Sequence, residues 1–120
     1  FEHADAFDAL RAAKPGEWDA VVCDPPKLAA SRGELPGALR KYEDMNALAF
    51  EKVARGGLVV SCSCSGLVSE GEFLAVLSRA ALRAGREVRV LEVGGAAADH
   101  PWALHHSAGR YLKVVWSEVG

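Results

Sequence analysis

Two short polar motifs contain the residue types that could do chemistry. Asp24 is followed directly by Pro25 and Pro26, and Cys64 lies in the run Ser-Cys-Ser-Gly at residues 63–66. The two prolines fix φ at successive positions, so a rigid loop could hold a planar base or an amine against the Asp24 carboxylate. The alternative for Asp24 is a turn cap, because Asp-Pro sequences favour turns. Cys64 could be a nucleophile, but only as a thiolate, and an ordinary thiol has a pKa of about 8.5.

Both motifs follow apolar runs that are typical of parallel strands. The first run, residues 18–23, is nearly continuous and predicts a strand buried on both faces. The second begins at Leu58 and continues into the cysteine motif. Between them, residues 35–54 have helical periodicity, and Gly56 with Gly57 is expected to end that helix.

The remaining elements follow from capping and turn signals. Ser69 has the S-x-x-E spacing of a capping box, so a helix should begin there and end at Gly85. We expect a short helix over 5–13 and further strands over 86–93 and 110–119. The last two strands are joined without a helical pattern, so that pair should be antiparallel.

This order predicts an α/β fold with parallel strands and an antiparallel final pair. In open α/β sheets, ligands bind beyond the carboxyl ends of the strands. Adjacent parallel strands would therefore place the Asp24 motif and the Cys64 motif side by side.

Other residues that could take part in chemistry have simpler structural explanations. Cys23 and Cys62 are expected to be small buried hydrophobic residues. A zinc site of Cys62 and Cys64 with loop histidines would lack a second close ligand pair, so we expect no metal. Asp5 is an N-cap candidate for the first helix, and His100 could be a base or a structural loop residue. The basic residues fall into two groups. The first is expected to form a solvated helix end: Arg79, Arg83, Arg86 and Arg89. The second follows the Asp24 motif and contains candidates for phosphate binding: Lys27, Arg32, Arg40 and Lys41.

Composition limits the classes of function. The chain has 120 residues, enough for one domain, and a formal net charge of −2, so no large basic field draws it to nucleic acid. Three cysteines make a poor disulfide framework and suggest a reducing, cytoplasmic compartment. No apolar run approaches the length that spans a membrane.

Four motifs together resemble one enzyme family. They are Asp-Pro-Pro-Lys-Leu-Ala at 24–29, Ser-Cys-Ser-Gly at 63–66, Ala-Asp-His-Pro at 98–101 and Tyr-Leu-Lys at 111–113. Their order is similar to that in class I S-adenosylmethionine-dependent methyltransferases. More narrowly, they resemble the RlmI-type enzymes that methylate cytosine C5 in large-subunit ribosomal RNA. The resemblance extends over essentially the whole chain and implies a Rossmann-like methyltransferase sheet.

The resemblance also implies roles for individual residues. Cys64 would be the nucleophile that adds to cytosine C6, and Asp24 would hold the cytosine edge near the methyl donor and could be the base. Asp5 matches the position that contacts the adenine of S-adenosyl-L-methionine. The cofactor contacts implied are Asp5, Phe7, Asp24 and Pro25, and the substrate contacts are Pro26, Lys27 and His100. Ribosomal RNA is the implied partner.

This chain departs from the family in several ways. Leu28 stands where relatives often have an aromatic residue. The Gly-rich cofactor loop, the acidic ribose ligand and an RNA-binding PUA domain are missing, so residues 1–120 are expected to form the C-terminal half of a methyltransferase domain. Strand 18–23 would then be a sheet edge open to self-association, and the isolated chain is expected to be inactive. The alternatives are a methyltransferase acting on another base, a protein or a small molecule, and a non-catalytic interaction module.

Overall fold

The computed structural model describes residue 14 and residues 16–24, 32–63, 67–94 and 113–120. The helix expected over residues 5–13 lies outside these ranges. The elements are strands β1 (Trp18–Cys23), β2 (Val53–Ser63), β3 (Val88–Gly94) and β4 (Lys113–Val119), helices α2 (Leu35–Lys52) and α3 (Glu70–Ala84), and a 3-10 turn, η1 (Arg32–Glu34).

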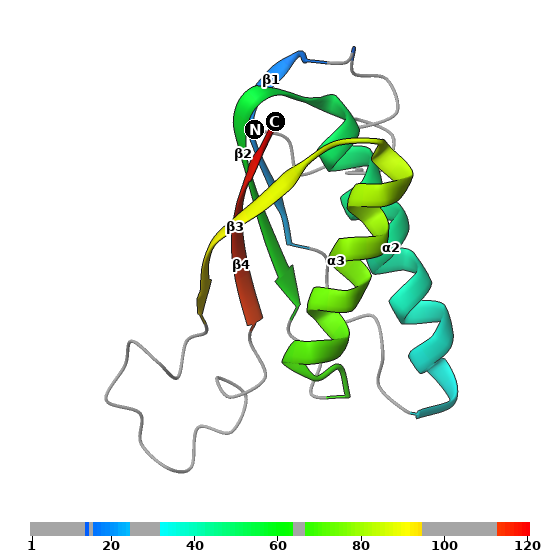
Figure 1. Ribbon diagram of the computed structural model, residues 1–120. Coiled ribbons are helices and arrows are strands. Elements are labelled where there is room, and N and C mark those ends of the chain that lie inside the picture. The colour runs from blue at the N-terminus through cyan, green and yellow to red at the C-terminus, as the bar shows by residue number, and fades with distance from the viewer. Residues whose placement is uncertain (1–13, 15, 25–31, 64–66, 95–112) are drawn as a thin grey trace.

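The four strands form one sheet in the order β1-β2-β4-β3. β1 is parallel to β2, and β4 is antiparallel to both β2 and β3. β1, β2 and β3 therefore point the same way, and β4 is inserted between β2 and β3 in the opposite direction. Figure 1 shows α2 and α3 packed side by side on one face of this sheet. The predicted α/β alternation and the antiparallel final pair are both confirmed.

Helix α3 begins and ends where its local signals predict. The Ser69 hydroxyl accepts a hydrogen bond from the Glu72 amide at 3.1 Å, and the Glu72 carboxylate accepts one from the Ser69 amide at 3.1 Å. At the other end Gly85 takes a left-handed conformation with φ 67°, which costs glycine little. Its inner face carries the buried side chains of Phe73 and Leu77.

The boundary between α2 and β2 differs from the prediction. The helix ends at Lys52, and β2 begins at Val53 rather than at Leu58. Val53 already pairs with Trp18, and Leu58 pairs with Ala20, so the strand bulges between these two pairs. The turn signal at Gly56 is used inside the strand, where its φ is 76°. Pairing with β1 therefore extends the strand through glycines that looked like a helix stop.

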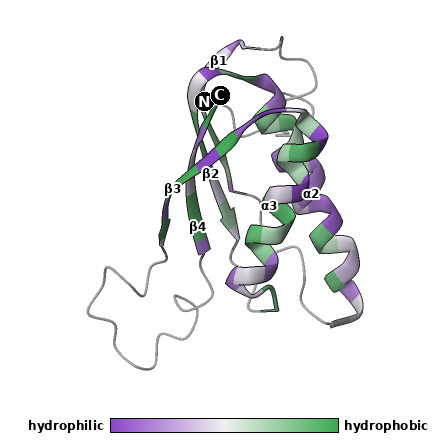
Figure 2. Cartoon of the chain, in the orientation of Figure 1, coloured by the Kyte–Doolittle hydropathy of each residue, from purple (hydrophilic) through white to green (hydrophobic). Residues whose placement is uncertain are grey.

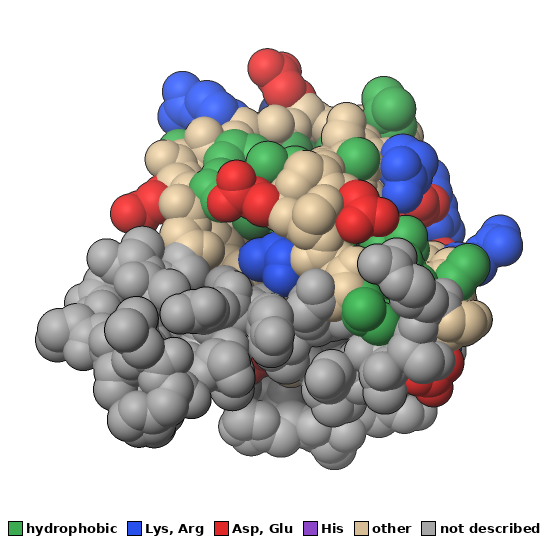
Figure 3. All heavy atoms as spheres, turned by 90° about the horizontal axis from the view of Figure 1, so that it is seen from below, with side chains coloured by type: hydrophobic (Ala, Val, Ile, Leu, Met, Phe, Trp, Pro, Cys, Tyr) green, Lys and Arg blue, Asp and Glu red, His purple; other side chains and the backbone are tan. Residues whose placement is uncertain are grey.

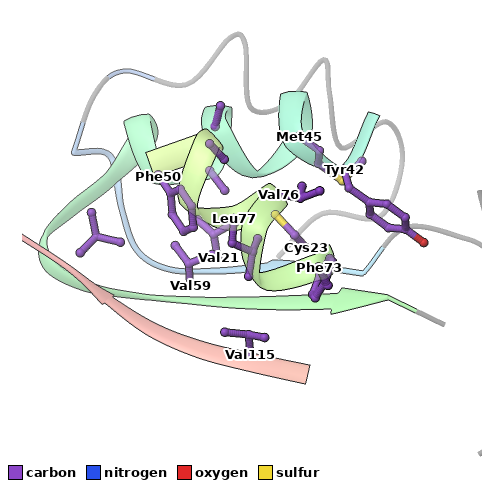
Figure 4. Close-up of a cluster of buried hydrophobic side chains, with 14 of the residues drawn as sticks. Val21, Cys23, Tyr42, Met45, Phe50, Val59, Phe73, Val76, Leu77 and Val115 are labelled. Carbon is purple, nitrogen blue, oxygen red and sulfur yellow. The ribbon is translucent and has the colours of Figure 1, made fainter. Parts of the chain in front are cut away.

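The hydrophobic core lies between the two helices and the sheet, as Figure 4 shows. The strands contribute Val21 and Val59, and the helices contribute Tyr42, Phe50 and Phe73, all of them buried. The rings of Tyr42 and Phe73 pack edge to face with centroids 5.6 Å apart. This contact joins α2 to α3 and supplies stabilisation beyond simple burial of area.

The prediction that β1 is buried on both faces is wrong. Val21 and Cys23 are buried beneath the helices, but the Val22 side chain is 42% exposed on the opposite face. Trp116 of β4, which lies in register with Val22 through β2, is 39% exposed. The reason is that both described helices cover the same face of the sheet, although Figure 2 shows apolar residues along the strands. β1 is an edge of the described sheet, as expected, and self-association through it stays a prediction.

The arginines near the end of α3 are largely exposed to solvent, as expected, but they also make contacts that were not predicted. Arg79 contacts Glu43 of α2 at 2.9 Å, and Arg83 contacts Glu43 at 3.0 Å and Asp44 at 2.5 Å. Hydrogen bonding to Arg79, and then to Arg83, holds the pKa of Glu43 below its usual value. These side chains are partly exposed, so the ion pairs orient α2 and α3 more than they stabilise them.

Arg86 and Arg89 also have partners. The Arg86 guanidinium donates to the Phe50 carbonyl at 2.9 Å and to the Val53 carbonyl, where α2 gives way to β2. The Arg89 guanidinium lies 2.8 Å from the carboxylate of Glu118 on β4. These four arginines therefore make tertiary contacts while three of them, Arg79, Arg83 and Arg89, stay exposed to solvent.

Candidate active site

The described chain brings the ends of several strands to one edge of the sheet. Cys23 is level with Ser61 in the parallel pairing, so Asp24 follows β1 close to where Ser63 ends β2. Ser63 pairs with Lys113, the first residue of β4. In Figure 1 this is the lower end of the sheet, where the parallel strands have their carboxyl ends and to which the arrow of β2 points. The strands that precede the two polar motifs are thus parallel neighbours, and the prediction that the motifs themselves lie side by side stays a prediction, because residues 25–31 and 64–66 lie outside the described ranges.

Asp24 is the predicted site residue that the structure describes, and its side chain is exposed at this edge. An exposed carboxylate beyond the carboxyl end of a parallel strand can accept hydrogen bonds from a bound amine or amide. The other predicted site residues lie outside the described ranges: Asp5, Phe7, Pro25, Pro26, Lys27, Cys64 and His100.

The two described cysteines are buried side chains, as predicted. Cys23 and Cys62 are buried, with 3% and 8% of their surface exposed. Burial, and then the proximity of Cys62, raises the pKa of the Cys23 thiol to about 12. A thiol with that pKa stays protonated at neutral pH and cannot act as a nucleophile.

A buried polar network that the sequence patterns did not predict lies beside the end of β2. The Ser61 hydroxyl donates to the Asn46 side-chain oxygen at 2.6 Å, and the Ser63 hydroxyl donates to the Tyr42 hydroxyl at 3.1 Å. The Asn46 amide nitrogen donates to the Tyr42 carbonyl at 2.8 Å. All four residues are at most 1% exposed. The signal in the sequence was Asn46, a polar residue on the apolar side of a helix.

The network fixes which way β2 presents its side chains. Ser61 and Ser63 point toward α2, because their hydroxyls bond to Asn46 and Tyr42. Side chains alternate along a strand, so Cys62 belongs to the opposite face. The described part of β2 therefore turns its two serines toward α2 and Cys62 away from it.

Charges are mixed at this end of the molecule. Figure 3 looks onto it from below and shows acidic and basic side chains interspersed over the described surface. Arg40 and Lys41 are exposed near the start of α2, and Lys27 lies outside the described ranges. The described residues include no group of histidine, cysteine and acidic side chains arranged to hold a metal ion. None of the described helices is long and apolar enough to cross a membrane.

Comparison with known proteins identifies close relatives. No family model matches the chain. It is 43% identical over 115 residues to the Ribosomal RNA large subunit methyltransferase I of Aeromonas hydrophila and 45% identical over 115 residues to the protein of that name from Photobacterium profundum. Each alignment covers 94% of this chain but 29% of the relative, so the chain spans less than a third of these relatives' length.

Solved structures show the same fold at low sequence identity. A protein assigned as a methyltransferase and crystallised with S-adenosylhomocysteine matches 96% of this chain and 30% of its own, with a TM-score of 0.71 and 17% identity. A protein of Thermus thermophilus assigned as a DNA modification methylase, in complex with S-adenosyl-L-methionine, matches 96% of this chain and 53% of its own, with a TM-score of 0.60 and 14% identity. The chain therefore has the class I methyltransferase fold and is homologous, over nearly all of its length, to part of the large-subunit ribosomal RNA methyltransferase I proteins.

Proposed function

We propose that the complete protein transfers a methyl group from S-adenosyl-L-methionine to C5 of a cytosine in large-subunit ribosomal RNA. This chain would be the C-terminal, catalytic part of its methyltransferase domain and would act on ribosomal RNA in the cytoplasm. The observation that carries the proposal is the 43% identity, over 94% of the chain, to relatives named for methylation of that RNA. The fold supports it independently, because the structural neighbours include proteins bound to S-adenosyl-L-methionine or its product.

The described end of β1 fits such a cofactor. Asp24 offers an exposed carboxylate at the edge where open α/β sheets bind ligands, and a carboxylate accepts hydrogen bonds from amino groups. When bound, S-adenosyl-L-methionine supplies an electrophilic methyl group. We assign Asp24 to the cofactor side of the site, together with Asp5, Phe7 and Pro25.

Cytosine C5 needs activation before it can take a methyl group, because an aromatic carbon is a poor nucleophile. The Cys64 thiolate would add to C6, and the new S–C6 bond pushes an electron pair onto C5. C5 then accepts the methyl group, and a base removes the C5 proton. The electrons of that C–H bond restore the C5–C6 double bond and expel the thiolate, so Cys64 is regenerated. Asp24 and His100 are the candidates for the base.

The RNA strand would lie across the same edge of the sheet. Pro26, Lys27 and His100 are the proposed contacts to the cytosine and its neighbours. Arg40 and Lys41, exposed on the first turns of α2, are placed for phosphate contacts. A net charge of −2 means that such contacts must come from local groups and not from a field over the whole chain.

The test is methyl transfer from labelled S-adenosyl-L-methionine to protein-free large-subunit ribosomal RNA, followed by digestion to nucleosides. The complete protein is compared with Cys64→Ala and with Cys62→Ala, a buried cysteine two residues away. Label in 5-methylcytidine that is lost in Cys64→Ala but kept in Cys62→Ala supports the proposal. Label in another nucleoside, or label undiminished without Cys64, contradicts the covalent mechanism.

A further inference from the structure

We infer that Tyr42 and Asn46 of α2 are positioning residues that hold the end of β2, and through it the direction of Cys64. They act by bonding to Ser63 and Ser61, the two serines that precede that cysteine. The inference rests on the proposed role of Cys64 and adds to it the device that would aim the thiol.

The two helix residues are spaced along α2 by about the same distance as the two serines are along β2. Tyr42 and Asn46 are one helical step of four residues apart, which is about 6 Å along an α-helix. Ser61 and Ser63 are two residues apart on one strand face, which is about 6.7 Å along a strand. The two rungs of hydrogen bonds therefore follow one another along both elements, Asn46 with Ser61 and Tyr42 with Ser63. Two rungs prevent β2 both from sliding along α2 and from rotating about its own axis.

A hydrogen bond inside the network fixes the orientation of the Asn46 side chain. Asn46 donates its amide nitrogen to the Tyr42 carbonyl at 2.8 Å, which leaves its side-chain oxygen directed at the Ser61 hydroxyl. The Tyr42 ring is held in turn by edge-to-face packing on Phe73 of α3. Figure 4 shows Tyr42 and Phe73 at the arrowhead end of β2. The end of the strand is thus tied to both helices.

Stability alone does not account for polar groups at these positions. β2 uses valine at Val59, which packs beneath the helices and is fully buried. A hydroxyl in the core must be paired to avoid a desolvation penalty, whereas an apolar side chain of similar size carries no such cost. What the hydrogen bonds add is direction. Covalent catalysis needs direction, because a displacement of about 1 Å at a nucleophile can cost on the order of a hundredfold in rate.

The chain provides a matched control in Ser117 of β4. Ser117 is 1% exposed, lies on the same face of the sheet as Val59, and its hydroxyl makes no hydrogen bond. Ser117→Ala and Ser63→Ala therefore remove the same buried group from neighbouring strands. Only Ser63→Ala breaks a rung of the network.

The experiment uses the complete protein with Tyr42→Phe, Ser63→Ala, both changes together, Ser63→Thr, and Ser117→Ala. We measure kcat and KM for methyl transfer to ribosomal RNA. We also follow the alkylation rate of Cys64 by iodoacetamide, by peptide mass spectrometry, between about pH 6 and about pH 10. We expect kcat to fall about tenfold in Tyr42→Phe and in Ser63→Ala, with KM for RNA within about twofold of wild type.

The double variant and the alkylation rates separate positioning from simple loss of stability. Since both single changes break the same hydrogen bond, the loss of rate in the double variant should be smaller than the product of the two single losses. The Cys64 alkylation rate should change at least about threefold in these variants, stay at the wild-type value in Ser117→Ala, and recover in Ser63→Thr, which keeps the hydroxyl. Values of kcat and alkylation rate within about twofold of wild type in Ser63→Ala would overturn the inference, as would losses that multiply in the double variant. Failure of the wild-type protein to form 5-methylcytidine would instead reject the proposed function, while the alkylation rates still decide whether the network positions Cys64.

Discussion

Arg86→Ala is expected to cause a large loss of stability for a single partly exposed residue. The guanidinium donates to the carbonyls of Phe50, Glu51 and Val53, and its Nε donates to the Gly120 carbonyl at 3.0 Å. It therefore closes the carboxyl end of α2, holds the first residue of β2, and fastens the end of β4. No other described side chain donates to this set of carbonyls.

The expected loss in the free energy of unfolding can be worked out from these contacts. The bonds to Phe50 and Val53 are partly buried, and hydrogen bonds from a charged group are each worth about 1 to 1.5 kcal/mol when partly screened. A cation at a helix carboxyl end adds about 0.5 kcal/mol. The bonds to Glu51 and Gly120 are exposed and are replaced by water at little cost. We expect Arg86→Ala to lower the free energy of unfolding by about 3 kcal/mol.

The assay is urea unfolding followed by far-UV circular dichroism, with Arg89→Ala as the control. Arg89 is three residues away and 71% exposed, and its ion pair with Glu118 should be worth at most about 0.5 kcal/mol. Arg86→Lys keeps the charge but not the planar fork of donors, so it should lose more than half of the effect. The reasoning is refuted if Arg86→Ala costs less than about 1 kcal/mol or if Arg86→Lys is as stable as the wild type.

Two further predictions concern the sheet. A Cβ at Gly57 would lie 2.6 Å from a Val53 methyl and 2.8 Å from two backbone oxygens, so Gly57→Ala should lower the free energy of unfolding by about 2 to 3 kcal/mol. Gly71→Ala, in a helix with nothing within 4 Å, should instead raise it by about 0.5 kcal/mol, and urea unfolding compares the two. Burial raises the pKa of the Cys23 thiol to about 12 from the ordinary value of about 8.5, so between these two pH values the unfolded chain loses a proton that the folded chain keeps. Stability should therefore fall by up to about 1.4 kcal/mol per pH unit between those values; unfolding at alkaline pH should show this slope, and Cys23→Ala should remove its contribution.

Local signals in the sequence were sufficient for α3. The capping box at Ser69 and the left-handed Gly85 each act within one turn of the chain, so neither depends on the rest of the fold. The same holds for the alternation of Ser61, Cys62 and Ser63 along β2, because the two-residue period of a strand is a property of its backbone. The parallel order of the strands was also predictable, since helical crossovers join strands that point the same way.

The start of β2 could not be predicted from local signals. Gly56 and Gly57 are common residues after a helix, and nothing nearby indicates that Val53 pairs with Trp18. That pairing joins residues 35 positions apart, so the free energy that extends the strand comes from tertiary structure. The exposure of Val22 has the same kind of cause, because it depends on which face of the sheet the helices cover.

The sequence by itself determined the class of fold, the edge at which the polar motifs begin, and the residue types available for chemistry, because these depend on short-range patterns. Only the tertiary structure decided the partners of the charged and polar side chains. Arg83 meets Glu43 across 40 residues, and Ser63 meets Tyr42 across 21. A hydrogen bond requires a donor and an acceptor within about 3 Å, and for residues so far apart along the chain only the packing of helices against the sheet brings them that close.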